Sequence, residues 1–289
     1  MNNKKPLSRR ASLLSLGRAC TLAALGTAVS SRKAHAAPKK ATAFALVGDR
    51  YHNSDYIRTA LGKTLVEGAG LSIDFTDEVK LLNAETLKGY KMLIVFRDGM
   101  LWPDGYGGSY PGYVQGTDME MKSIPPVPEK KSEPVMWMQP HQGKAVRDFV
   151  ESGGSAFFFH NNSHVSLSNK DYRDVEGAIY TGHPPVRPFR VRITDKSHPI
   201  TQGVDDFLVT DEQHYVTYDK DPKYVLMRSE NADGLAYGDQ GTSCEAGWAY
   251  EYGKGRVCFL APGHMIYVLW NPEYVKLQQN AVKWLLREI

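Results

Sequence analysis

The amino-acid sequence predicts an α/β protein in which a mostly parallel sheet is flanked by helices. Strand-like and helix-like segments alternate along residues 41–96, as they do in chains that build a parallel sheet with crossover helices. The apolar run "SAFFF" (155–159) follows a glycine pair and ends in polar residues, which is typical of a central strand buried on both faces. In such sheets ligands bind in a crevice at the carboxyl ends of the strands.

The first half of the chain gives the clearest alternation. "ATAFALVG" (41–48), "LSIDF" (71–75) and "YKMLIVF" (90–96) are predicted strands, because each is short, apolar and rich in β-formers. A helix is expected from Ser54 to Glu67, with Ser54 as its cap.

The pattern stops between Asp98 and Met138, where "DGMLWPDGYGGSYPGYVQG" (98–116) is rich in Gly, Pro, Tyr and Trp. A stretch of this length is usually a binding loop, a lid or a plain insertion. We expect an aromatic-rich insertion whose Trp102 and Tyr106 contact a sugar, with a plain insertion loop as the open alternative. No Lys-Ser or Lys-Thr closes its glycines into a phosphate loop, so no nucleotide cofactor is expected.

The alternation resumes with a predicted helix, Pro140–Glu151, and then the central strand. Further strands are expected at "FRVRITD" (189–195) and "KYVLMRS" (223–229), and "GWAYEYGKGRVCFLAPGH" (247–264) is a predicted hairpin. The end of the chain is a predicted amphipathic helix whose apolar stripe comprises Tyr274, Leu277, Ala281, Trp284 and Leu285.

Residues 1–36 have the layout of an export signal. Arg9-Arg10 resembles a twin-arginine signal, a short apolar stretch follows, and Ala34-His35-Ala36 is a small-residue cleavage site. We therefore expect a periplasmic or extracellular protein cleaved after Ala36, in which residues 37–289 form one domain. The apolar stretch is too short to span a bilayer, so no membrane span is expected after removal of the signal.

Removal of the signal also changes the charge and the cysteine count. It takes away seven basic residues and no acid, so the formal net charge of +3 becomes −4. Nucleic-acid binding, which needs a clustered basic face, is therefore not expected. Cys244 and Cys258 remain, and a hairpin turning at Lys254 would place Cys258 opposite Tyr250, so no disulfide between them is expected.

Reactive side chains recur beside predicted strand ends and turns. They are Asp49, His52, His160, His183, Glu212, His214 and His264. Each alone is more often a capping or hydrogen-bonding group than a ligand, and their spacing matches no sequence signature for a metal site. Alternation in an extended "DEQHY" would put His214 on the same side as Glu212.

From Val150 onward the chain resembles the ThuA-like (trehalose utilisation) family. The resemblance lies in "FVESGGSAFFFHNNS", "VEGAIYTGHPP", "RVRITDKSHPITQGVDDFLVTDEQHY" and "GWAYEYGKGRVCFLAPGH", in that order. It implies a flavodoxin-like fold similar to that of class I glutamine amidotransferases. In that fold the turn after the central strand presents a nucleophilic cysteine, whereas this chain has His160. Glutaminase chemistry is not expected, because an imidazole does not replace an activated thiolate.

The resemblance implies a site made of His160, His183, Glu212 and His264. These residues suit a divalent metal such as zinc, and His160 with Glu212 also suits metal-free acid–base catalysis. The residues expected to contact substrate are Asp49, His52, Trp102, Tyr106 and His214. The implied function is a hydrolase or lyase that acts on an oxidised (keto) glycoside, together with a sugar oxidoreductase. The open alternative is a non-catalytic protein of the same fold that binds a small carbohydrate.

Overall fold

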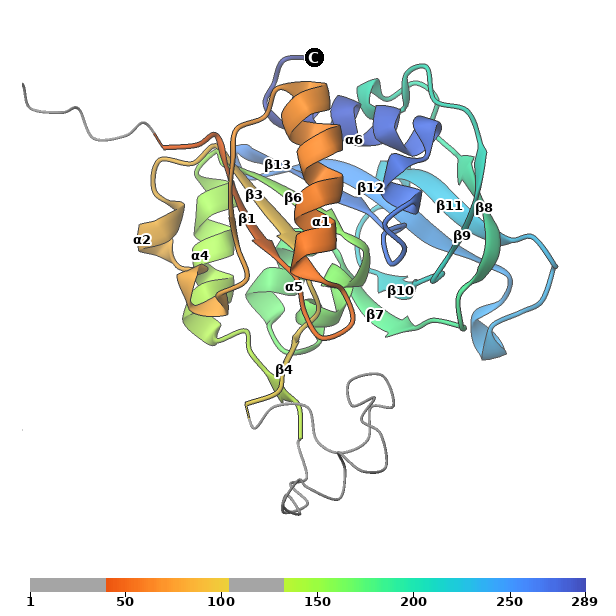
Figure 1. The fold of residues 1–289 in the computed structure, drawn as a ribbon, viewed down its shortest axis with the longest axis horizontal. Coiled ribbons are helices and arrows are strands. Elements are labelled where there is room, and N and C mark those ends of the chain that lie inside the picture. The colour runs from red at the N-terminus through yellow and green to blue at the C-terminus, as the bar shows by residue number, and fades with distance from the viewer. Residues whose placement is uncertain (1–39, 104–132) are drawn as a thin grey trace, which may run out of the picture. The chain divides into compact units, whose positions relative to one another are not determined.

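The computed structural model describes residues 40–103 and 133–289, and a nine-stranded sheet runs through them (Figure 1). Up to the central strand the elements are β1 (Ala43–Val47), α1 (Ser54–Leu61), η1 (Gly62–Glu67), β2 (Ile73–Thr76), η2 (Val79–Leu81), α2 (Ala84–Leu87), β3 (Met92–Phe96), β4 (Met100–Leu101), β5 (Val135–Met136), α4 (Pro140–Glu151) and β6 (Ser155–Phe159). Here η denotes 3-10 helical turns, except that η1 is π-helical. The predicted export signal and Tyr106 lie outside the described residues.

The second half adds strands more often than helices. Its elements are η3 (His160–Leu167), α5 (Lys170–Glu176), β7 (Ala178–Gly182), β8 (Arg187–Ile193), η4 (Pro199–Thr201), β9 (Phe207–Asp211), β10 (Tyr215–Tyr218), η5 (Pro222–Tyr224), β11 (Val225–Asn231), η6 (Gly238–Gln240), β12 (Ser243–Tyr252), β13 (Gly255–Leu260), η7 (Val268–Trp270) and α6 (Pro272–Leu285). None of the helices in 40–103 and 133–289 is long and apolar enough to cross a membrane.

The large sheet has a parallel core and an antiparallel extension. Its strand order is β2-β1-β3-β6-β13-β12-β11-β8-β9. The strands from β2 to β13 run parallel to their neighbours, whereas each pairing from β13 to β9 is antiparallel. The predicted α/β fold flanked by helices is confirmed, and the sheet is mixed, with a parallel core. Four reversals of direction return β9 to the direction of β13, so both strands end at the same edge of the sheet.

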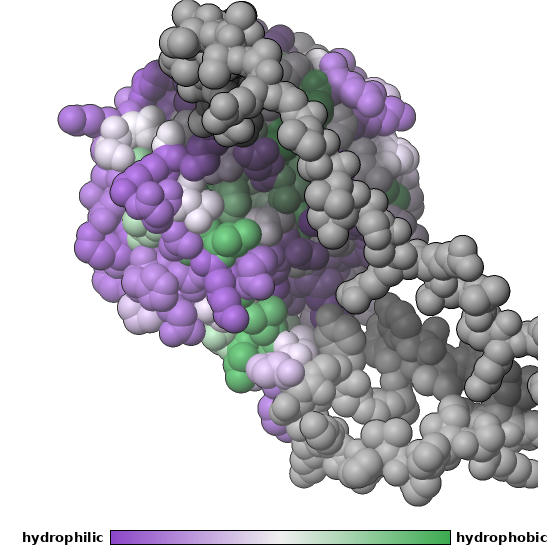
Figure 2. All heavy atoms as spheres, turned by 60° about the vertical axis from the view of Figure 1, so that its left-hand side comes forward, coloured by the Kyte–Doolittle hydropathy of each residue, from purple (hydrophilic) through white to green (hydrophobic). Residues whose placement is uncertain are grey.

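Helices cover the parallel core from two sides (Figure 1). α6 packs with η1, while α4 packs with α2 and α5. The predicted stripe of α6 is confirmed, since all five of its residues are buried. On the face that carries α2 and α4, Figure 2 shows mostly hydrophilic side chains among the described residues, with only scattered apolar ones.

The core explains the Phe-rich strand β6. Phe157, Phe158 and Phe159 are fully buried, because helices cover both faces of the strand. On β12 and β13, Trp248 stacks on Phe259 with ring centroids 4.1 Å apart. The polar residues that follow this apolar run in the sequence begin where β6 ends, in η3.

Three sequence predictions need correction at the level of single residues. Helix α1 is capped by Asn53, whose side chain accepts from the amides of Asp55 and Tyr56, so Ser54 is its first residue rather than its cap. The helix changes to π-helical geometry at Gly62. In the predicted hairpin Cys258 lies opposite Ala249 instead of Tyr250, because the turn is tighter by one residue. Cys244 and Cys258 are both free, as expected.

A buried carboxyl group on α5 gives a first testable prediction. Glu176 is fully buried, and its Oε2 accepts from Ser166 Oγ and from the Ala178 amide, each at 3.1 Å. Burial raises the pKa of Glu176 to about 8. Between the ordinary value of 4.5 and about 8 the folded state therefore binds the extra proton, and stability falls as pH rises, by up to about 1.4 kcal/mol per pH unit.

Glu176→Gln should remove this contribution. Urea unfolding at pH 5, 6, 7 and 8 is expected to show that the free energy of unfolding of the variant increases relative to that of the wild type as pH rises. Equal pH dependence in the two proteins would contradict the assignment. Asp174→Asn, which removes a half-exposed carboxylate on the same helix, is the control for loss of a carboxylate.

Candidate functional site

The carboxyl ends of four strands bring together a histidine and glutamate cluster. His52 follows β1, His160 follows β6, Glu212 follows β9 and His264 follows β13. One ligand atom from each lies within 4.8 Å of the others. We call these four residues the imidazole cluster. Three of them belong to the predicted metal set, while His52 was expected to contact substrate instead.

His160 begins η3 with a left-handed backbone (φ 50°), which is uncommon for a residue other than glycine. Its side chain is fully buried, and Nδ1 lies 2.8 Å from the carbonyl oxygen of Ala261. A carbonyl only accepts, so we assign the proton to Nδ1. Nε2 then carries a lone pair, faces Glu212 Oε2 at 3.6 Å and has no hydrogen-bond partner among the described residues.

His52 is oriented in the same way by a carboxylate. Its Nδ1 lies 2.9 Å from Asp49 Oδ1, while Asp49 Oδ2 accepts from Asn161 Nδ2 at 2.8 Å. Burial acts to raise the pKa of Asp49, but its interaction with His52 and the hydrogen bonds from the amides of Asp98 and Tyr51 outweigh burial and lower the pKa. Nε2 of His52 is left facing His264 Nδ1 at 3.1 Å. Asp49 thus supports an imidazole, and the structure places its side chain behind His52.

Glu212 is the centre toward which the imidazoles point. Its Oε2 lies 3.2 Å from His264 Nδ1, 3.4 Å from His214 Nε2 and 3.8 Å from His183 Nε2. Burial acts to raise the pKa of Glu212, but the imidazoles of His160, His214 and His264 around it outweigh burial and lower the pKa. Burial lowers the pKa of both His160 and His214, which favours the neutral imidazole in each.

His183 and His214 form a second group that shares Glu212 with the imidazole cluster. Their rings stack with centroids 5.0 Å apart. His183 Nδ1 lies 2.8 Å from the Pro184 carbonyl oxygen, so its Nε2 also turns a lone pair toward Glu212. His214 lies beside Glu212, as the extended pattern predicted. The predicted set is therefore brought near Glu212, but His183 falls in a different group of potential ligands from His160 and His264.

The loop after β13 is fixed by Asp211. This buried carboxylate accepts from the amides of Gly263 at 2.6 Å and Met265 at 2.9 Å, and the intervening His264 amide lies 3.3 Å away. Burial raises the pKa of Asp211 above its ordinary value. Gly263 packs so closely that a Cβ there would lie 2.8 Å from both the Cβ of His160 and the ring of Phe96. Asp211 and Gly263 therefore set the position of His264 relative to His160.

A cavity of about 390 Å³ opens beside the cluster. Among its lining residues are Asp98, His164, Tyr180, His183, Glu212 and His214. Asp98 and His164 were not predicted as site residues. Asp98 follows β3 as the other residues follow their strands, so the same strand-end rule could have found it.

Asp98 is the acid of this cavity. Burial, and then the negative charge of Asp49, raise its pKa to about 7. Its Oδ1 accepts from the Met100 amide at 2.8 Å, and its main-chain carbonyl accepts from Trp137 Nε1 at 2.7 Å. A carboxyl group with this pKa can hold or release a proton near neutral pH.

The aromatic residues of the insertion are placed only in part. Trp102 carries the Arg50 guanidinium over its ring, 4.1 Å from the centroid, and is not among the residues that line the cavity. At the base of the insertion β4 pairs with β5, so the predicted structureless stretch contains a short two-stranded sheet.

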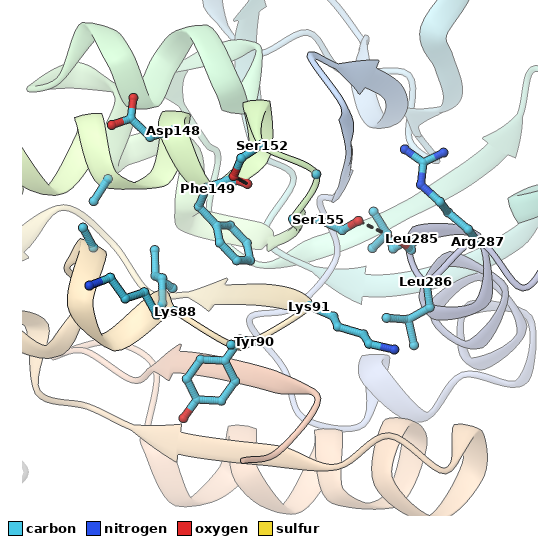
Figure 3. Close-up of a pocket in the computed structure, with 16 residues that line it drawn as sticks. Lys88, Tyr90, Lys91, Asp148, Phe149, Ser152, Ser155, Leu285, Leu286 and Arg287 are labelled. Atoms are coloured by element: carbon cyan, nitrogen blue, oxygen red, sulfur yellow. Dashed lines mark hydrogen bonds between the residues drawn. The ribbon is translucent and has the colours of Figure 1, made fainter. Parts of the chain in front are cut away.

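A separate cavity of about 540 Å³ lies at the amino ends of β3 and β6. Figure 3 shows the apolar side chains of Phe149 and Leu286, the basic side chains of Lys88 and Lys91, and the hydrogen bond from Ser155 Oγ to the Leu285 carbonyl. None of the potential metal-ligand groups formed by the described residues lies there. The reactive groups are at the opposite edge of the sheet.

Solved structures share this fold at low sequence identity. A ThuA-like protein from Parabacteroides merdae matches with a TM-score of 0.59 at 12% identity, covering 86% of this chain and 90% of that one. A ThuA-like protein from Bacteroides uniformis matches with a TM-score of 0.55 at 16% identity, covering 88% and 94%. A β-galactosidase from Rahnella sp. R3 matches with a TM-score of 0.52 at 10% identity, covering 86% of this chain but 31% of that one.

Sequence comparison gives the family. No curated protein matches the chain. The family model described as trehalose utilisation matches residues 129–285, which is more than half of the 289 residues and includes His160, Glu212 and His264. Because this match covers more than half of the chain, the chain belongs to the ThuA family of trehalose utilisation proteins.

Proposed function

We propose that this protein is exported and works in sugar utilisation as a metal-assisted hydrolase or lyase of an oxidised (keto) glycoside. The carrying observation is that the His160 and His183 lone pairs converge on Glu212. A lone pair that faces a carboxylate is repelled by it, and a cation between the two would relieve the repulsion. Imidazoles with one carboxylate are the donor set that suits zinc and similar divalent ions.

The residues fit such an ion well. His52, His160, His264 and Glu212 would hold it, and Asp49 and the Ala261 carbonyl would keep two of the imidazoles in the tautomer that binds metal. When bound, a divalent metal polarises a carbonyl or activates water. His214, whose Nε2 lies 3.4 Å from Oε2, would keep Glu212 oriented from the side of the cavity.

The chain itself would supply the proton transfers. Asp98 lines the same cavity as Glu212 and holds a proton at its carboxyl near neutral pH, so it can give that proton to a departing sugar oxygen or take one beside a keto group. The described cysteines are unsuited to nucleophilic attack, because both are buried and burial raises the pKa of each thiol, that of Cys244 to about 12. The proposed function therefore does not include glutaminase chemistry.

The proposal extends to location and partner. A keto glycoside must first be made by oxidation of a hydroxyl group, so an oxidoreductase acting on sugars would supply the substrate. The twin-arginine signal ending at Ala36 would carry the folded protein to the same compartment as extracellular sugars.

Elemental analysis tests the proposal directly. The mature protein, purified without a His-tag, is expected to hold about one divalent ion per chain, and His160→Ala is expected to lose it. The loaded wild type should cleave a monoketo derivative of trehalose and leave trehalose itself intact.

A folded wild type that stays free of metal after incubation with zinc or manganese would end the metal mechanism. Binding of trehalose by such a protein without turnover, measured by calorimetry, would instead identify the non-catalytic carbohydrate-binding protein. Exposed His141→Ala is the control for loss of a histidine.

A further inference from the structure

His164 lies on the second turn of η3, four residues after His160, and lines the cavity with Asp98, Tyr180 and Glu212. It belongs to neither group of potential metal ligands among the described residues. Its ring lies beside that of Tyr180, with centroids 5.4 Å apart. The mechanism above does not use it.

At Nδ1 the ring of His164 accepts a hydrogen bond, whereas at Nδ1 the ring of His160 donates one. The amide of Gly99 donates to Nδ1 of His164, with N and Nδ1 3.3 Å apart. An amide nitrogen donates and does not accept, so Nδ1 must offer its lone pair and the proton of the neutral ring lies on Nε2. His160, by contrast, carries its proton on Nδ1 because its partner is a carbonyl.

Glycine at position 99 makes this contact possible. A Cβ on Gly99 would lie 3.1 Å from Nδ1 and 3.0 Å from the carbonyl oxygen of His164. The Gly99 backbone is itself held in place, because its carbonyl accepts from the Trp137 amide at 3.0 Å. The donor that fixes the tautomer of His164 is therefore built into the base of the insertion.

The ring stays neutral and its second nitrogen is available. Burial lowers the pKa of His164, and the opposing attraction of the Asp49 charge does not reverse this. Within residues 40–103 and 133–289 no group accepts a hydrogen bond from Nε2. The cavity wall thus offers one N–H donor, while the imidazole cluster offers lone pairs.

We propose that His164 donates a hydrogen bond from Nε2 to an oxygen atom of the ligand and favours a carbonyl oxygen that gains negative charge during the reaction. A neutral imidazole suits this task because it polarises the oxygen without giving up its proton to it. The proposal deepens the proposed function, since it names the part of the keto glycoside that the cavity recognises: the oxygen of the keto group.

The tautomer is measured first, because it does not depend on any activity. In protein with 15N-labelled histidine, a long-range 1H–15N correlation spectrum at pH 7, assigned with His164→Gln, is expected to show His164 with its proton on Nε2. A proton on Nδ1, or a charged ring, would overturn the inference whatever the protein catalyses.

The ligand contact is measured next, with a monoketo derivative of trehalose as the probe. The Nε2–H signal of His164 is expected to shift on saturation with the probe. His164→Ala should lower kcat/KM about 100-fold, as loss of one donor to an oxyanion does, while His164→Gln keeps a donor and most of the rate. His141→Ala, on the exposed face of α4, should leave the rate unchanged.

The outcomes separate the two proposals. Metal content should be the same in the wild type and both His164 variants, because His164 is not among the proposed ligands. A metal-loaded, active His164→Ala enzyme with the wild-type rate would refute the role of His164 and leave the proposed function standing. A wild type without metal would refute the proposed function, and the absence of any shift at His164 with the probe would then refute the ligand contact as well.

Discussion

Glu212→Gln is expected to leave the protein folded but unable to retain a divalent metal. Glu212 supplies the only carboxylate of the imidazole cluster, and four imidazole nitrogens lie within 3.8 Å of its Oε2. Glutamine has almost the same shape but no charge, so the cluster would keep its lone pairs and lose its negative ligand. Removal of a residue that only hydrogen-bonds to a metal ligand typically weakens metal affinity about 10- to 100-fold. Removal of the ligand itself should weaken the affinity by more than that.

The measurement is zinc affinity by competition with a chromophoric chelator at pH 7, with the rate on the monoketo probe in parallel. Glu67→Gln makes the same chemical change at an exposed position on η1 and should behave as the wild type. Stoichiometric metal in Glu212→Gln would show that the ion, if one binds, is held elsewhere.

The local part of the fold is predictable from the sequence. Helix α4 spans Pro140–Glu151 as predicted, because a proline at its start and Gly153 after its end mark the bounds within the sequence itself. The strands β1, β3 and β6 are equally predictable, because each is a buried apolar run in the sequence. The cap of α1 is harder to assign, since Asn53 and Ser54 are both good capping residues and only the backbone geometry chooses between them.

The site is predictable only as a list of strand ends. Sequence order indicates that polar residues follow β6, β9 and β13, but not which of them meet. His52 joins the cluster because β1 and β6 both pair with β3, a consequence of strand order that no local pattern encodes. The raised pKa of Asp98 and the tautomer of His164 depend on long-range contacts with Asp49 and Gly99, so they lie beyond sequence reasoning as well.

Gly263→Ala is expected to damage the site through a single methyl group. The new Cβ would lie 2.8 Å from the Cβ of His160 and from the ring of Phe96, closer than carbon atoms can pack. The loop cannot move away freely, because Asp211 holds the amides of Gly263 and Met265. His160 cannot yield freely either, since its Nδ1 is bound to the Ala261 carbonyl. Such overpacking typically costs about 1–3 kcal/mol.

Urea unfolding and zinc affinity together measure this effect. Gly263→Ala should lower both, because the strain falls on a proposed ligand. Gly62→Ala is the matched control: its φ of −55° is helical and a Cβ there meets nothing within 4 Å, so that variant should be as stable as the wild type or gain up to about 1 kcal/mol. If Gly263→Ala matches Gly62→Ala in both measurements, the close packing of the loop on His160 does not hold the cluster in place. If it loses metal affinity, then Gly263, which follows β13, is part of the site because it positions His160 and not because it binds the metal.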